Sequence, residues 1–344
     1  VGLERTLRRL GDDERLVALL EEVASNEKDA SRRALLELER ATLLEERLRQ
    51  LPMAQTVLTD LADSDVPVSG EAEARLRALL EREADWPGLY ERIARDLGQG
   101  RDFEVQRELA MLCRDRLRDP VRAADHMERA LAEEPGRPDS LQILATLYRE
   151  LDKPEEVVRI LEAELETEPD AERARTIHGE AATLYAGELD DDAEAERHHR
   201  EILNLDPGAT ESVAFLTVRL DGEGRHAELA ALLQERLDHV ADDPATETGL
   251  RLRIAALQEG PLDDRLAAIE TLLPAAESEA SIAVVAEPLT DWLQREGRDE
   301  ELVQIARRAS ASAELPAERG TWLMRIGDAL TRTGEDEAAA DAYR

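Results

Sequence analysis

Apolar side chains recur along the chain at the three- and four-residue spacing of a helical face. A clear example is the set Leu141, Leu144, Ala145, Tyr148 and Leu151. Such spacing brings the apolar groups to one side of an α-helix, where they can be buried together. No part of the sequence shows the strict alternation that is typical of a β-strand. The pattern therefore predicts an all-α protein.

The helical patterns come in pairs, and the second member of several pairs ends in an acidic residue followed by proline. This ending occurs in segments 123–135, 157–169 and 195–207. Proline cannot continue the helical hydrogen-bond ladder and disfavours helix in the residue before it. The prolines at 135, 169, 207 and 244 are 34, 38 and 37 residues apart. We interpret the repeating unit as helix, turn, helix, turn, with these prolines as terminators.

About ten such units cover the chain, and stacking is the way in which single hairpins bury their apolar faces. The units that we expect are 1–31, 32–68, 71–102, 103–137, 138–171, 172–207, 208–244, 245–278, 279–315 and 316–344. We group them as degenerate hairpins in 1–102, well-formed repeats in 103–207, degenerate hairpins in 208–315 and a final repeat in 316–344 that is truncated in its second helix. All belong to one continuous solenoid in this interpretation.

The best-formed units resemble the tetratricopeptide repeat, a helical hairpin of about 34 residues. The residues that carry the resemblance are Leu323, Ile326, Gly327, Leu330, Gly334, Ala339 and Tyr343 in the last unit, Leu141, Leu144, Ala145, Tyr148 and Pro169 in unit 138–171, and Ala110, Ala123, Ala130 and Pro135 in unit 103–137. The resemblance implies a right-handed α-solenoid whose first helices line a concave face. It also implies a protein-binding scaffold and no enzymatic activity.

Candidate partner-binding residues follow from the concave positions of the two best units. They are Asp139, Gln142, Thr146 and Arg149 in one unit and Met324, Asp328 and Thr331 in the other. Some family members bind acidic peptide ends through a Lys and Asn clamp, but this chain has only two lysines and two asparagines, at other positions. We therefore expect other proteins or peptides as partners, and not acidic peptide termini held by that clamp.

The charge balance is strongly acidic, with 79 acidic against 44 basic side chains and a formal net charge of −35. Binding of nucleic acid by phosphate neutralisation needs a basic surface, so nucleic acid is excluded as a partner. The excess has two interpretations that stay open: an adaptation to a saline environment or GC-rich genome, or attraction of a basic partner. No apolar run approaches the roughly 18 residues of a membrane-spanning helix, so no membrane insertion is expected.

Residues with catalytic or metal-binding chemistry are present but lack the surroundings that such chemistry needs. Glu194 and His198 are four residues apart and share a helical face, yet the expected role of His198 and His199 is in the core or on the surface. Cys113 is expected to be a small core residue. Gly222 and Gly224 belong to a hairpin turn and not to a phosphate-binding loop. We expect no catalytic residue, metal or cofactor.

The two ends of the sequence suggest that it is part of a longer protein. Val1 begins inside a helical pattern, and Arg344 ends inside another. On this view the protein is a bacterial scaffold within a larger polypeptide or assembly, located in the cytoplasm, or in the periplasm if a signal segment is missing. Two alternatives are a sensor or regulatory arm of a signalling kinase or NTPase, and a lattice or filament subunit that associates with itself.

Overall fold

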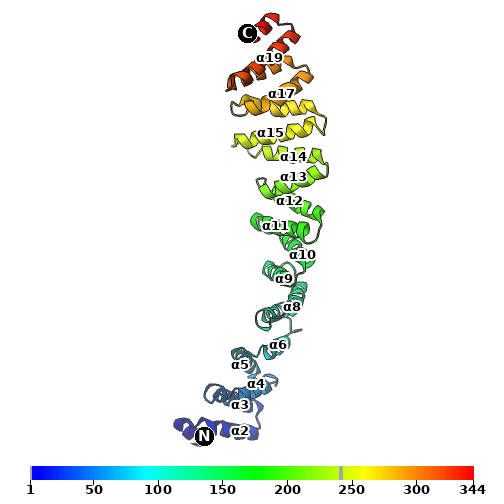
Figure 1. Ribbon diagram of the computed structural model, residues 1–344. Helices are drawn as coiled ribbons and strands as arrows, with labels where there is room; N and C mark the ends of the chain where they lie inside the picture. The colour runs from blue at the N-terminus through cyan, green and yellow to red at the C-terminus, as the bar shows by residue number, and fades with distance from the viewer. Residues whose placement is uncertain (1, 240–242) are drawn as a thin grey trace. The chain divides into compact units, whose positions relative to one another are not determined.

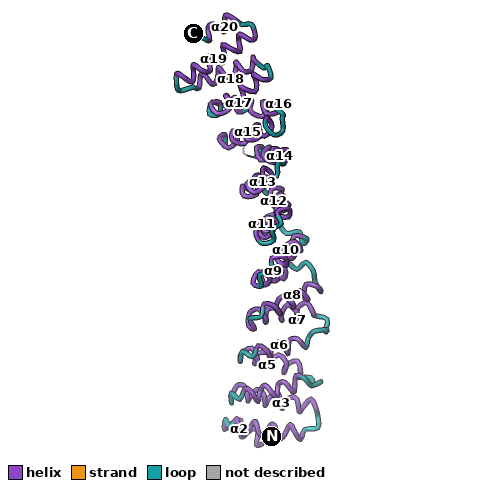
Figure 2. Tube along the Cα trace, turned by 45° about the vertical axis from the view of Figure 1, so that its right-hand side comes forward, coloured by secondary structure: helices purple, strands orange, loops and turns teal. Residues whose placement is uncertain are grey.

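The computed structural model describes residues 2–239 and 243–344, and the regular structure in these ranges is entirely helical. Figure 2 shows the helices joined by short loops. The chain divides into two compact units, residues 1–168 and residues 169–344, and each is described by itself.

The first unit consists of ten α-helices and one π-helical turn within its described residues (Figure 1). They are α1 (Gly2–Leu10), α2 (Asp13–Asn26), α3 (Ala30–Glu46), α4 (Leu51–Ala62), α5 (Ser69–Arg82), α6 (Trp86–Ala94), α7 (Asp102–Leu112), η1 (Cys113–Leu117), α8 (Pro120–Glu133), α9 (Pro138–Glu150) and α10 (Pro154–Leu165).

The second unit continues the same succession of helices within its described residues (Figure 1). They are α11 (Ala171–Gly187), α12 (Asp192–Leu205), α13 (Thr210–Gly222), α14 (His226–Leu237), α15 (Pro244–Glu259), α16 (Arg265–Leu272), the 3₁₀ turn η2 (Ala275–Glu277), α17 (Ile282–Arg295), α18 (Asp299–Ser312), α19 (Pro316–Thr333) and α20 (Asp336–Ala342).

Helices that follow one another in the sequence pack against each other in both units. Each odd-numbered helix forms a hairpin with the even-numbered helix after it, and within each unit every hairpin packs against the next. The prediction of an all-α fold of stacked antiparallel hairpins is therefore confirmed within each unit. Each hairpin leaves an apolar surface that its neighbour covers, which is the physical basis of repeat stacking.

Aspartate and proline mark the beginnings of many helices. Asp119, Asp170 and Asp264 each accept a hydrogen bond from a backbone N–H of the first turn that follows them. These side chains satisfy N–H groups that the helix leaves without an internal partner. Part of the acidic excess is thus used to start helices.

One expected terminator has the opposite role. Pro244 is the first residue of α15, whereas α14 already ends at Leu237. Proline fits the first position of a helix because an N–H at that position would have no acceptor within the helix, so its absence costs nothing. Asp243, the residue before Pro244, caps the start of α15. The spacing pattern that placed Pro244 among the terminators was therefore wrong at this position.

The core of each unit is built from Leu, Ile, Val and Ala, with small residues where helices approach closely. Ala110, Ala123 and Ala130 are at most 1% exposed in the α7/α8 hairpin. In the second unit, Leu289, Leu293 and Ala329 are completely buried in the cluster that runs from α15 to α20. A larger side chain at the alanine positions would force the packed helices apart.

Candidate functional site

The four candidate residues of α9 lie together on its solvent side. Asp139, Gln142, Thr146 and Arg149 are all exposed, while Leu141, Leu144 and Leu147 of the same helix are buried. Gln142 donates through Nε2 to Oε1 of Glu164 at 3.0 Å, and Thr146 donates to the backbone oxygen of Gln142 at 2.9 Å. The face can therefore offer hydrogen bonds and charge to a partner without disturbing the core.

The three candidates of α19 also share one exposed face, but two of them have partners within the chain. Met324 is 56% exposed. Asp328 accepts a hydrogen bond from the Tyr343 hydroxyl at 2.6 Å, which raises the pKa of that hydroxyl. Thr331 donates to the backbone oxygen of Gly327 at 2.8 Å. The face of α19 is therefore held in part by its own hairpin, as Gln142 and Thr146 of α9 are by theirs.

A groove between α8, α9 and α10 was missed by the sequence reasoning. It encloses about 690 Å³ and lies within the first unit. Its residues are Glu128, Leu131 and Ala132 of α8, Pro135 and Gly136 of the following turn, Leu141 and Leu144 of α9, and Arg159, Ile160, Ala163, Glu166 and Thr167 of α10 and its end. A volume of this size is typical of sites that bind ligands or side chains.

Small residues are the signal in the sequence that could have indicated this groove. Ala132, Gly136 and Ala163 stand where larger side chains would fill the space between the second helices of two successive hairpins. The pattern of buried positions could not reveal it, because small residues are also expected at close helix contacts. Only the distance between α8 and α10 in the folded chain decides whether the space between these helices is filled by side chains or left open.

A hydrogen-bonded network connects the α7/α8 hairpin to the α9/α10 hairpin at one end of the groove. Glu128 accepts from the Tyr148 hydroxyl at 2.5 Å and from Arg159 Nη2 at 2.6 Å, and Arg159 also donates to Glu156 at 2.7 Å. Burial and the neighbouring Glu128 carboxylate raise the pKa of Tyr148 far above its usual value. The tyrosine therefore stays protonated and serves as a donor.

The histidines of the second unit are mainly packing residues. His198 of α12 is completely buried, its Nδ1 lies 2.8 Å from Nδ1 of His178, and its ring stacks on Tyr185. His199 stacks on Phe215 with a centroid distance of 4.2 Å and contacts the Ser212 hydroxyl. These contacts agree with the expected core role.

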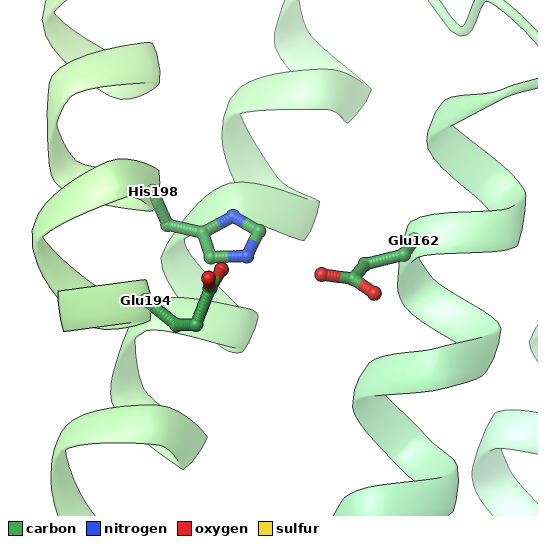
Figure 3. A group of neighbouring side chains, drawn as sticks. All are labelled: Glu162, Glu194 and His198. Carbon is green, nitrogen blue, oxygen red and sulfur yellow. The ribbon is translucent and has the colours of Figure 1, made fainter. Parts of the chain in front are cut away.

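Glu194 and His198 lie one turn apart on α12, and their side chains are drawn in Figure 3. This confirms that they share a helical face. The pKa of His198 is lowered to about 4, mainly by burial and then by the charge of Arg197. Glu162, which is also drawn, belongs to α10 of the first unit.

Glu196 is the centre of the most extensive ion-pair network of the α12–α14 region. Its carboxylate, 10% exposed, accepts hydrogen bonds from Arg225, Arg219 and Arg200. Hydrogen bonds from Arg225 and from the other two guanidinium groups lower the pKa of Glu196 to about 2. The network joins the α11/α12 hairpin to the α13/α14 hairpin, and we interpret it as structural.

The remaining sequence candidates have structural positions. Cys113 is completely buried, and burial raises the pKa of its thiol, so it is not an activated nucleophile. Gly222 and Gly224 lie at the turn between α13 and α14, and Gly224 adopts a positive φ of 69°. Both findings confirm the interpretation from the sequence. Among the helices in residues 2–239 and 243–344, none combines the length and apolar character needed to cross a membrane.

Comparison with solved structures finds matches at low sequence identity. A tetratricopeptide repeat protein from Parabacteroides merdae is 18% identical, covering 71% of this chain and 91% of that chain with a TM-score of 0.29. YrrB, described as a tetratricopeptide repeat protein with an unusual peptide-binding site, is 14% identical, with coverages of 56% and 95% and a TM-score of 0.31. MamA is 12% identical, with coverages of 46% and 91% and a TM-score of 0.29. TM-scores this low carry no argument about this chain.

Comparison with sequences is more specific, although no curated protein matches the chain. Residues 117–180 match the family model described as tetratricopeptide repeat. This segment includes α8, α9 and α10, and therefore both the exposed face of α9 and the groove. The chain thus contains tetratricopeptide repeats, placed by this match at residues 117–180 within a longer series of helical hairpins.

Proposed function

We propose that this chain is a non-enzymatic scaffold that binds other proteins through the exposed faces of its hairpins. Tetratricopeptide repeats generally mediate protein–protein interaction. The observation that carries the proposal is the face of α9, where four polar or charged side chains, Asp139, Gln142, Thr146 and Arg149, are exposed beside a fully formed core. Met324, Asp328 and Thr331 of α19 are a second candidate surface in the other unit.

A basic partner fits the charge of the chain best. With a formal net charge of −35, the surface attracts cationic groups and repels acidic ones, and this attraction weakens as salt screens it. Side chains at such surfaces contribute mainly to the rate and selectivity of association. The affinity itself then depends on a few buried contacts.

Co-purification of the full-length protein with its partners, followed by mass spectrometry, tests the proposal. The informative variant is Thr146→Arg, which places a bulky cation on the face of α9. Its matched control is Thr56→Arg on α4, because Thr56 is also exposed and donates to the backbone oxygen four residues before it, at 3.0 Å. Both changes alter the charge equally.

We expect specific partners to be recovered by the native protein and the control, and to be reduced with Thr146→Arg. Recovery should also fall as salt is raised. If the native protein recovers no partner above background, the scaffold function is wrong. If light scattering instead shows self-association at micromolar concentration, the chain is a lattice or filament subunit.

A further inference from the structure

We infer that the groove between α8, α9 and α10 binds a short basic segment of a partner protein, anchored by one large apolar side chain. The inference rests on the proposed function and adds a second surface to it. The groove lies on the other side of α9 from the exposed face, because Leu141 and Leu144 line the groove while Gln142 and Thr146 are exposed. The two surfaces can therefore be tested separately.

The floor of the groove is suited to an apolar group. Leu141, Leu144 and Ile160 form it, and each is at most 4% exposed. The walls are Leu131, Ala132 and Ala163, which present aliphatic carbon to the same space. Transfer of a large aliphatic or aromatic side chain from water into such a site is favourable. An apolar anchor is thus the expected main source of affinity.

The groove is lined by small side chains, and contacts within the unit connect its walls. At one end, Glu128 and Arg159 bridge α8 and α10. Gly136 turns with a positive φ of 76° beside Thr167, and a Cβ on Gly136 would be in ordinary contact with Thr167 Cγ2 at 3.6 Å. A hollow of about 690 Å³ lined by three helices favours a short segment over an extended surface.

The rim of the groove favours a basic segment. Glu166 is exposed at the end of α10 and, among the described residues, has no ion-pair partner. Arg159, the one basic residue of the lining, is already paired with Glu128 and Glu156. Acidic residues outnumber basic ones about two to one between Pro120 and Glu168. An Arg or Lys next to the apolar anchor would therefore find a carboxylate, whereas an acidic residue would be repelled.

Selection from a random peptide library displayed on phage tests the inference with the whole 344-residue chain as bait. We expect enriched peptides to combine one large apolar residue with adjacent Arg or Lys. Synthetic copies of these peptides, labelled with fluorescein, then give dissociation constants by anisotropy. Replacing the apolar residue by Ser should weaken binding at least tenfold, and raising the salt concentration should weaken it as well.

Variants of the chain locate the binding site. Ala163→Arg and Ala132→Arg fill the groove from opposite walls, and both positions are at least partly exposed, so the helices can accommodate the change. Each should weaken binding at least tenfold while leaving the melting temperature nearly unchanged. Thr56→Arg, an equal charge change at an exposed position of α4 outside the groove, should leave the peptide affinity within twofold of the native value.

A matched pair of variants tests the role of the charge at the rim. Glu166→Lys should weaken binding several-fold, whereas Glu150→Lys, an equal charge change at an exposed α9 position outside the groove, should have little effect. Lack of enrichment, enrichment of acidic peptides, or equal loss with Glu150→Lys would overturn the inference.

Failure of the inference can be distinguished from failure of the scaffold function. If the full-length protein recovers its partners equally well with Ala163→Arg and Ala132→Arg, but less well with Thr146→Arg, the groove is not the docking site although the scaffold function stands. If neither the native protein nor any variant recovers a partner, the scaffold function fails as well.

Discussion

Arg225 binds the carboxylate of Glu196 with both terminal guanidinium nitrogens, from Nη1 to Oε2 at 2.8 Å and from Nη2 to Oε1 at 2.9 Å. Glu196 lies on α12, and Arg225 directly precedes α14. Paired hydrogen bonds of this kind fix the orientation of both groups as well as their distance. The pair therefore determines how two successive hairpins of the second unit are aligned.

Replacing the central carboxylate should destabilise the second unit. In Glu196→Gln, three guanidinium groups lose their shared counter-charge, and we expect a loss of about 3 kcal/mol in the free energy of unfolding. Glu194→Gln is the control, because Glu194 is 40% exposed and forms a surface ion pair with Arg197 at 2.6 Å. It should cost less than about 1 kcal/mol. Urea unfolding measures both, and equal losses would contradict the assignment.

The same carboxylate predicts how stability depends on acid. The pKa of Glu196 is about 2 in the folded chain, below the ordinary value of 4.5, so the unfolded chain binds its proton first as the pH falls. The stabilisation is complete above about pH 5 and is lost progressively as the pH falls toward 2. The difference in unfolding free energy between the native chain and Glu196→Gln should shrink over this range. A constant difference would show that the carboxylate is not the cause.

His198 should remain neutral to unusually low pH. Its folded pKa is about 4 because it is buried and lies beside Arg197, whereas an unfolded histidine titrates near 6.5. The unfolded chain therefore binds more protons between these values, and this group makes the fold less stable as the pH falls from 6.5 to 4. NMR titration of the imidazole carbon-bound protons measures the pKa directly. A folded-state midpoint near 6.5 for His198 would contradict this prediction.

A side chain at Gly327 should displace Tyr343, because a Cβ there would collide with the tyrosine ring. In Gly327→Ala we expect the ring to be displaced and α20 to lose protection against amide hydrogen exchange. Gly320→Ala on the same helix meets nothing within 4 Å. That control should stabilise α19 by up to about 1 kcal/mol through its higher helix propensity. Equal exchange rates for α20 in both variants would show that the contact is unimportant.

Much of this architecture could be predicted from the sequence because its causes are local. The spacing of Leu141, Leu144 and Tyr148 was sufficient to place a helix and its buried side, and the structure buries all three. Gly327 and Tyr343 matched the repeat pattern, and the structure brings them into contact. The role of Pro244 could not be predicted, because proline is compatible with both the end of one helix and the start of the next.

The sequence by itself determined that the chain is a series of helical hairpins, since helix periodicity, turn residues and apolar faces are properties of neighbours along the chain. It also determined the acidic surface. Only the tertiary structure decided that Arg225, Arg219 and Arg200 converge on Glu196, that Asp328 already binds Tyr343, and that a groove lies between α8 and α10. These features depend on distances between helices, and such distances are determined by how the side chains of different hairpins fill the space between them.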